Sequence, residues 1–194
     1  MLEYLASADR ALFERINGAW QNGLFDRLMP FLSSDGNFKV LFVIVFVLLL
    51  VFGKTRERWA ALLVILLLAL SDQLSSHFLK AAFHRVRPCH VLEHVHLLAG
   101  CSGSWSMPSS HAANSAAAAV HFMFFYRRWR VPLAVTAFAV GYSRCYVGVH
   151  YPADVLVGFL VGAAAACAIQ AIYRNVSPRW PRRHSARPAP PVQV

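Results

Sequence analysis

Six charged or ionisable side chains stand out because they border long apolar stretches of the chain. They are Lys80, Arg87, His111, Arg144, His150 and Asp154. Charges inside apolar sequence are costly to keep and usually serve a function. Arginine offers planar paired donors and lysine a compact positive charge, and both bind phosphate well. The three cations therefore predict an anion site.

A helix start lies beside this set. Pro108 is followed by Ser109 and Ser110, which predicts a hydroxyl cap and unpaired backbone N–H groups at the beginning of a helix. Such a helix start binds anions, and His111 on its first turn is then expected beside the bound group. The interpretation is a phosphate pocket with an imidazole at its edge.

A second helix is expected to begin near Pro152, because proline fits the first helical position. This places His150 just before the helix and Asp154 within its first turn. A carboxylate at that spacing can hold one imidazole nitrogen and leave the other as a nucleophile. The pattern therefore predicts nucleophilic attack by His150 with Asp154 as its orienting partner.

The elements that position these residues are predicted to be membrane helices. The chain has 194 residues, of which 57% are hydrophobic and 14% charged, whereas soluble proteins have about 45–50% and about 25%. This composition excludes a typical soluble globule and a disordered chain. The fold class is predicted as all-α, a polytopic membrane helix bundle. Five spans are expected, at residues 40–52 (beginning before Phe38), 59–79, 109–126, 131–149 and 153–173.

The N-terminal part is less apolar. Residues 1–20 alternate leucines with charges at near-helical spacing, which predicts an amphipathic helix at the membrane surface. Residues 24–32 fit either a second surface helix or part of a weak sixth span. The predicted organisation is an N-terminal interfacial segment (1–36), a transmembrane catalytic domain (37–174) and a flexible basic cytoplasmic tail (175–194).

Basic residues predict the orientation. The formal net charge is +10, and 11 of the 19 basic residues lie in the segments 54–58, 127–130 and 174–187, which share one face by parity. Positive loops favour the cytoplasm, so the charge reflects topology and no nucleic acid partner is expected. The six site residues then lie at the outer ends of the spans, facing the periplasm or exterior of a bacterial inner membrane.

Three segments resemble the three-part signature of the type 2 phosphatidic acid phosphatase (PAP2) superfamily. They are Lys80, six residues, then Arg87-Pro88; Pro108-Ser109-Ser110-His111; and Ser143-Arg144, five residues, His150, three residues, Asp154. The resemblance implies that His150 forms a phosphohistidine and that His111 protonates the leaving oxygen and later helps to activate water. It implies that Lys80, Arg87, Ser109, Ser110 and Arg144 hold the phosphoryl oxygens, with no metal and no cofactor. The family usually has glycine where this chain has Ser110.

The predicted function is hydrolysis of a phosphomonoester or diphosphate of a membrane lipid, best matched by undecaprenyl diphosphate. Alternative substrates are phosphatidylglycerophosphate, phosphatidic acid and a lipid A phosphate. A lipid-phosphate binder or translocator is an alternative that would need the cations but not the His150–Asp154 pair. The bilayer and the lipid substrate are the expected partners, and no obligate protein partner is inferred.

The outer loop adds two further expectations. Cys89 and Cys101 both lie in it, where an oxidising exterior permits a disulfide. The loop region also carries additional cationic or protonatable groups, expected to hold a second phosphoryl group. They are His84, Arg85, His90 and His94.

Overall fold

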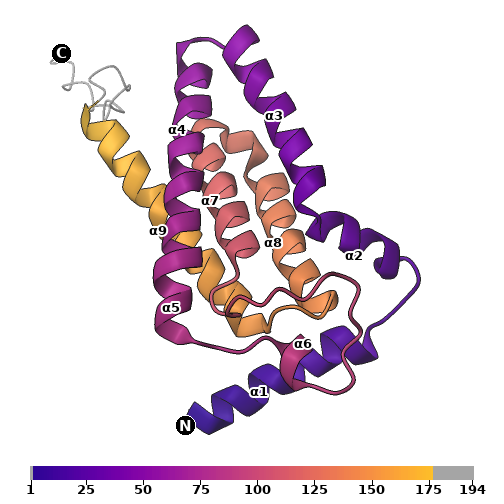
Figure 1. Cartoon of the computed structure of the whole chain (residues 1–194). Coiled ribbons are helices and arrows are strands. Elements are labelled where there is room, and N and C mark those ends of the chain that lie inside the picture. The colour runs from indigo at the N-terminus through magenta and orange to yellow at the C-terminus, as the bar shows by residue number, and fades with distance from the viewer. Residues whose placement is uncertain (1, 177–194) are drawn as a thin grey trace, which may run out of the picture.

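The computed structural model describes residues 2–176 and is all-α over that range (Figure 1). The helices run α1 (Leu2–Glu14), α2 (Phe25–Ser33), α3 (Asp35–Phe52), α4 (Thr55–Asp72), α5 (Lys80–Phe83), α6 (Pro88–Val91), α7 (Ser110–Phe125), α8 (Arg130–Tyr146) and α9 (Pro152–Val176). Short π-helical segments cover Arg15–Ala19 and Gln73–Leu79, and a 3-10 turn covers Arg127–Trp129. The predicted all-α class is confirmed. The tail predicted from residue 175 lies, beyond Val176, outside the described residues.

Two helical stretches, Thr55–Val91 and Pro152–Val176, are long and apolar enough to cross a membrane, and Lys39–Phe52 is a shorter apolar helix. Large apolar side chains of α3, among them Val40, Leu41 and Phe52, are exposed. A helix that exposes so much apolar surface needs an apolar surrounding. The exterior of the bundle therefore fits a lipid environment.

The centre of the bundle is α7, which packs against α4, α8 and α9 (Figure 1). Its buried face consists largely of alanines, and α9 meets it with Gly158 and Gly162. A Cβ at Gly162 would overlap the carbonyl oxygen of Ala113, and one at Gly158 would overlap that of Ser109. Small residues in this pattern allow close helix contact. The consequence is that the first turns of α7 and α9 lie together, with the Ser109 N–H donating to the Asp154 carbonyl oxygen at 3.0 Å.

The predicted span at residues 59–79 is longer and less regular than a single α-helix. After α4 the chain continues through the π-helical segment Gln73–Leu79 into α5. The helix ends at His84, whose backbone is left-handed (φ 48°), as is common just after a helix. Lys80 is thus carried to the end of the bundle and the chain turns there into the loop that holds Arg87.

The N-terminal region forms two short helices, α1 and α2, which pack against the outside of the main bundle. α1 lies across the end of the bundle where α9 begins (Figure 1), and α2 packs on α8. α2 has nine residues, which span about 13 Å and so fall well short of a bilayer core of about 30 Å. Of the two interpretations of residues 24–32, the structure favours a surface helix.

Candidate active site

The predicted site residues come from five places in the chain that meet at one end of the bundle. Lys80 opens α5, Arg87 precedes α6, and Ser109, Ser110 and His111 begin α7. Arg144 lies on the last turn of α8, and His150 and Asp154 lie before and within the first turn of α9. A cavity of about 660 Å³ opens between these segments. Six of the eight predicted residues line it: Lys80, Arg87, Ser110, His111, Arg144 and His150.

His150 and Asp154 form a buried pair. His150 is 2% exposed and Asp154 is fully buried, with 3.5 Å between His150 Nδ1 and an Asp154 carboxylate oxygen. The Ser106 hydroxyl donates to the same carboxylate oxygen and lies 3.4 Å from His150 Nδ1. The N–H of Tyr151 also donates to it, at 2.8 Å. Asp154 is therefore fixed on the Nδ1 side of the ring.

The other ring nitrogen of His150 contacts an arginine that lines the cavity. His150 Nε2 lies 3.1 Å from Nη1 of Arg87. Burial lowers the pKa of His150 from about 6.5 to about 3, with Arg87 also lowering it and Asp154 opposing. The imidazole is therefore neutral at neutral pH, as a nitrogen nucleophile must be.

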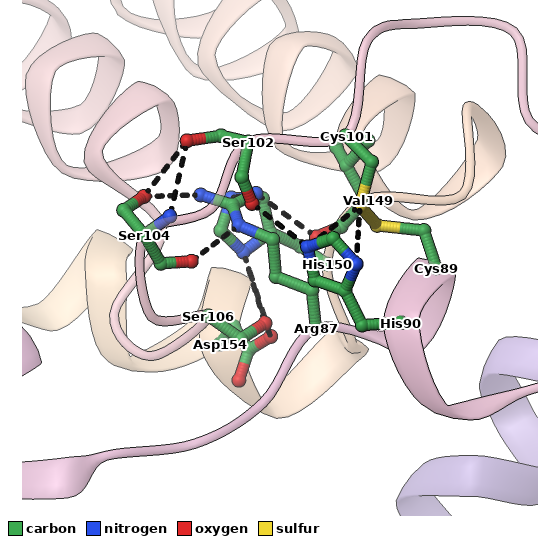
Figure 2. The surroundings of a disulfide bond; sticks show 10 residues. All are labelled: Arg87, Cys89, His90, Cys101, Ser102, Ser104, Ser106, Val149, His150 and Asp154. Carbon is green, nitrogen blue, oxygen red and sulfur yellow. Dashed lines mark hydrogen bonds and ion pairs between the residues drawn. A yellow bond between two sulfur atoms is a disulfide. The ribbon is translucent and has the colours of Figure 1, made fainter.

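Arg87 is held by backbone and serine groups of the outer loop, some of which Figure 2 draws around the disulfide. Its Nε donates to the Ser104 carbonyl oxygen at 2.8 Å, and its Nη2 to the Ser104 hydroxyl at 3.0 Å. Nη1 also donates to the Val149 carbonyl oxygen at 3.1 Å. Lys80 Nζ lies 3.4 Å from the same Ser104 hydroxyl. Ser104 thus links two of the predicted phosphate-binding cations.

The start of α7 departs from one expectation. Ser109 is the residue preceding the helix, as predicted, but its side chain makes no capping hydrogen bond. Its backbone instead connects the first turns of α7 and α9, through the bond to Asp154, and the side chain is buried away from the cavity. The predicted hydroxyl cap is therefore wrong. Ser110 and His111 are the residues of this segment that line the cavity.

Arg144 reaches the cavity from α8 and is fixed by α2. Its Nη1 donates to the Ser33 carbonyl oxygen at 2.9 Å and also to the Ser33 hydroxyl. Ser33 is the last residue of α2. α2 therefore contributes to the position of a predicted phosphate-binding arginine.

Sequence reasoning missed the serines that support the site. Ser104 binds Arg87, and Ser106 binds Asp154. The signal was the alternation of Ser102, Ser104 and Ser106, since residues two apart lie on one side of an extended segment. Asp72 and Ser76 precede Lys80 by eight and four residues. The Ser76 hydroxyl donates to Asp72 at 3.1 Å and lies 2.9 Å from that of Ser110.

The extra cationic groups of the outer loop lie elsewhere than expected. Arg85 pairs with Asp154 and Asp9, the His84 ring packs on Trp105 at 5.0 Å, and His90 lies 3.1 Å from the Ser102 carbonyl oxygen. None of these three, nor His94, is among the described residues that line the cavity. The expectation that they hold a second phosphoryl group is wrong for the cavity as the structure forms it.

The predicted bridge between Cys89 and Cys101 is present (Figure 2). His90 lies beside it, so three residues of metal-binding type gather here. Two of them are joined as a disulfide and have no thiolate to offer a metal. The bridge ties the Arg87 end of the outer loop to the segment that carries Ser104.

A cation-lined cavity beside a buried neutral histidine is typical of an enzyme that transfers phosphoryl groups. The exposed apolar side chains of this bundle indicate a membrane protein. A family model described as the PAP2 superfamily matches residues 59–178. The chain belongs to the PAP2 superfamily. It is a membrane-bound PAP2-type phosphatase, a hydrolase acting on lipid phosphates.

Known proteins of several substrate classes are similar to this chain. The lipid A 4'-phosphatase of Porphyromonas gingivalis is 29% identical over 189 residues, covering 92% of this chain and 78% of the relative. The undecaprenyl-diphosphatase of Sulfolobus acidocaldarius is 33% identical over 153 residues, covering 78% and 72%. The crystal structure of a transmembrane PAP2-type phosphatidylglycerolphosphate phosphatase from Bacillus subtilis superposes with a TM-score of 0.72 at 24% identity, covering 91% and 90%.

Proposed function

We propose that this protein hydrolyses undecaprenyl diphosphate to undecaprenyl phosphate through a phosphohistidine on His150. The observation that carries the mechanism is the position of His150 Nε2, which lies 3.1 Å from Nη1 of Arg87, with both residues lining the cavity. In the first step the Nε2 lone pair forms a bond to the terminal phosphorus, and the bond from phosphorus to the bridging oxygen breaks. Asp154 stabilises the positive charge that develops on the ring.

His111 is assigned as the acid. It lies on the first turn of α7 and lines the same cavity, where it protonates the departing oxygen. In the second step it takes a proton from water, whose oxygen attacks phosphorus and breaks the phosphorus–nitrogen bond. Lys80, Arg87, Arg144 and the backbone N–H of Ser110 hold the phosphoryl oxygens as negative charge develops, while the Ser109 N–H, bound to the Asp154 carbonyl oxygen, keeps the start of α7 against α9.

The preference for a diphosphate rests on the cation content of the cavity. Besides the three cations predicted from sequence, Lys39 at the start of α3 lines it. A fourth positive group exceeds what one phosphate needs and suits a second phosphoryl group. The undecaprenyl-diphosphatase relative is consistent with this choice.

A lipid A phosphate is the second candidate. The relative from Porphyromonas gingivalis, a lipid A 4'-phosphatase, matches 92% of this chain. A monophosphate on a sugar would use the same nucleophile and acid, with Lys39 left to contact the headgroup. Phosphatidic acid and phosphatidylglycerophosphate are the diacyl alternatives.

The test is phosphate release by purified protein from a panel of these lipids in mixed micelles. We expect kcat/KM for undecaprenyl diphosphate to exceed that for phosphatidic acid at least about tenfold, which corresponds to roughly 1.4 kcal/mol of transition-state binding. Lys39→Gln should reduce the advantage. A higher value for lipid A would reassign the substrate, and loss of activity in a chelator would contradict the metal-free mechanism.

The proposed topology has five crossings, formed by α3, the α4–α5 stretch, α7, α8 and α9, in a bacterial inner membrane. The site faces the periplasm, because the basic loops near Lys54 and Arg128 favour the cytoplasm and the Cys89–Cys101 disulfide suits an oxidising side. In a chain with both bridging cysteines replaced by serine, an impermeant thiol reagent should label Gly100→Cys in intact cells and Lys54→Cys only after lysis. The reverse result would move the site to the cytoplasm.

A further inference from the structure

Arg85 joins the site to α1. Its Nη1 lies 2.9 Å from Oδ1 of Asp154, and its Nη2 lies 2.5 Å from Oδ2 of Asp9 on α1. The guanidinium also sits over the Tyr151 ring, 4.1 Å from its centre. One planar cation thus bridges two carboxylates that are 145 positions apart in the chain (154 − 9).

Asp9 has a second contact that fixes the other end of the bridge. Its Oδ1 accepts a hydrogen bond of 2.8 Å from the N–H of Ala153, in the first turn of α9. The Asp9 side chain is only 10% exposed. A single residue of α1 therefore holds both Arg85 and the backbone next to Asp154.

The two oxygens of the Asp154 carboxylate have different hydrogen-bond partners. Oδ2 accepts from Ser106 and Tyr151 and faces His150, whereas Oδ1 accepts from Arg85. A fully buried carboxylate needs a counter-charge and hydrogen bonds to remain ionised. Arg85 supplies the counter-charge from the side opposite the imidazole, without occupying the oxygen that faces His150.

We propose that Arg85 and Asp9 are positioning residues of the phosphatase: Arg85 orients the Asp154 carboxylate toward His150, and Asp9 holds Arg85 in place. The proposal rests on the function assigned to His150 above. It replaces the expectation that Arg85 contacts the substrate, since both ends of its guanidinium are bound to carboxylates. It also gives α1 a role in turnover.

The test compares Arg85→Gln and Asp9→Asn with a control variant, Glu14→Gln, on the same helix as Asp9. Arg10 and Glu14 form an exposed ion pair on α1 at 2.8 Å, so Glu14→Gln removes an α1 carboxylate that has no contact with Asp154. We expect kcat to fall about 100-fold in Arg85→Gln and about tenfold in Asp9→Asn, with KM within about threefold of wild type. Glu14→Gln should match wild type.

The orienting role predicts that the effects are not additive. Once Asp154→Asn has removed the carboxylate, Arg85→Gln should lower kcat by less than about threefold more, because there is no charge left to orient. Arg85→Lys should recover part of the loss relative to Arg85→Gln, although an ammonium cannot bridge both carboxylates as the planar guanidinium does. A role in folding alone would lower the yield of active enzyme without this dependence on Asp154.

The proposal would be overturned by unchanged kcat in Arg85→Gln or by additive losses of kcat when Arg85→Gln is combined with Asp154→Asn. It would also be overturned by a raised KM with unchanged kcat in Arg85→Gln, since direct substrate contact gives that result. If Arg85→Gln does not fold, Asp9→Asn decides, since it leaves the Arg85–Asp154 pair in place, and unchanged kcat there overturns the proposal. Failure of the proposed function is seen separately, in a wild-type protein that releases no lipid phosphate or a His150→Ala protein that still does.

Discussion

Nη1 of Arg87 lies 3.1 Å from Nε2 of His150. An arginine can only donate, so the Nε2 atom accepts and carries its lone pair, and the ring proton is on Nδ1, on the side of Asp154. This is the tautomer that attack on phosphorus requires. A phosphoryl group that reaches Nε2 must take the place of this contact, so the Arg87 side chain has to shift from His150 to the phosphoryl oxygens when substrate binds.

Replacing His150 with alanine should remove turnover by at least about three orders of magnitude, because it deletes the proposed nucleophile. The measurement is phosphate release under saturating lipid, together with acid-labile labelling of the protein from a substrate that carries radioactive phosphate in the transferred position. His94→Ala, which removes an exposed histidine of the outer loop, is the matched control and should keep both signals. Full activity in the His150→Ala protein would exclude the mechanism.

Replacing His111 with alanine should affect substrates according to their leaving group. The alkoxide that leaves a monoester must be protonated as it departs, whereas the phosphate that leaves a diphosphate is more stable as an anion. The loss in the rate of phosphohistidine formation should therefore be at least about tenfold larger for a monoester than for a diphosphate. Rapid-quench measurements of the labelled enzyme separate this step from hydrolysis. Equal losses for both substrates would contradict the role of His111 as the acid.

The pH dependence of stability should report the burial of His150. The unfolded chain takes up this proton near pH 6.5, but the folded protein does so only near its lowered pKa of about 3. This contribution to stability is therefore fully present above about pH 6.5 and is lost as the pH falls toward about 3. Thermal unfolding in detergent should show Tm falling between about pH 7 and pH 5 in wild type, and falling less in His150→Gln. If Tm fell by the same amount with pH in wild type and in His150→Gln, a buried neutral imidazole would be contradicted.

The Cys89–Cys101 bridge should support both stability and substrate turnover. It closes a loop of 12 positions, and bridges of this kind typically contribute about 2–4 kcal/mol. The double serine variant should have a lower Tm and a kcat/KM reduced about tenfold, because Arg87 and Ser104 lie close in sequence to the two cysteines and hold each other. Cys167→Ala, at an exposed position on α9, is the control. Unchanged kcat/KM after reduction would show that the bridge does not help to place Arg87.

Six of the residues that line the cavity could be predicted from sequence, most of them because charged and imidazole side chains are rare in apolar stretches. A charge such as Lys80 or Arg144 costs so much there that its presence alone indicates function. The residues that support them are harder to predict. Ser104 and Asp9 are ordinary surface types, and their contacts with Arg87 and Arg85 exist only because the outer loop and α1 fold over the end of the bundle.

The helix bounds, too, could be predicted from the sequence only in part. Hydropathy places α7, α8 and α9 to within a few residues of the predicted spans. It did not indicate the π-helical segment Gln73–Leu79, since an extra residue in one turn leaves hydropathy unchanged. It also did not predict that α2 would hold Arg144 through Ser33, because that contact depends on tertiary packing rather than on local sequence.

Ser110 offers the last test, because it is the position at which the chain departs from the PAP2 signature that it resembles. The helix begins at Ser110, and a helical backbone suits any L-residue, so the substitution causes no strain. The hydroxyl joins a chain through Ser76 to Asp72, and losing one such hydrogen bond typically costs about 1 kcal/mol.

We therefore expect Ser110→Gly to keep kcat/KM within about fivefold of wild type with a slightly lower Tm. Ser110→Val should reduce kcat/KM more than about tenfold, because its branched side chain projects into the cavity where the phosphoryl group binds. Lipid phosphatase assays and thermal unfolding on the two variants decide between a structural and a substrate-contacting hydroxyl. If Ser110→Gly lost as much activity as Ser110→Val, the hydroxyl itself would be a phosphate ligand that glycine cannot replace.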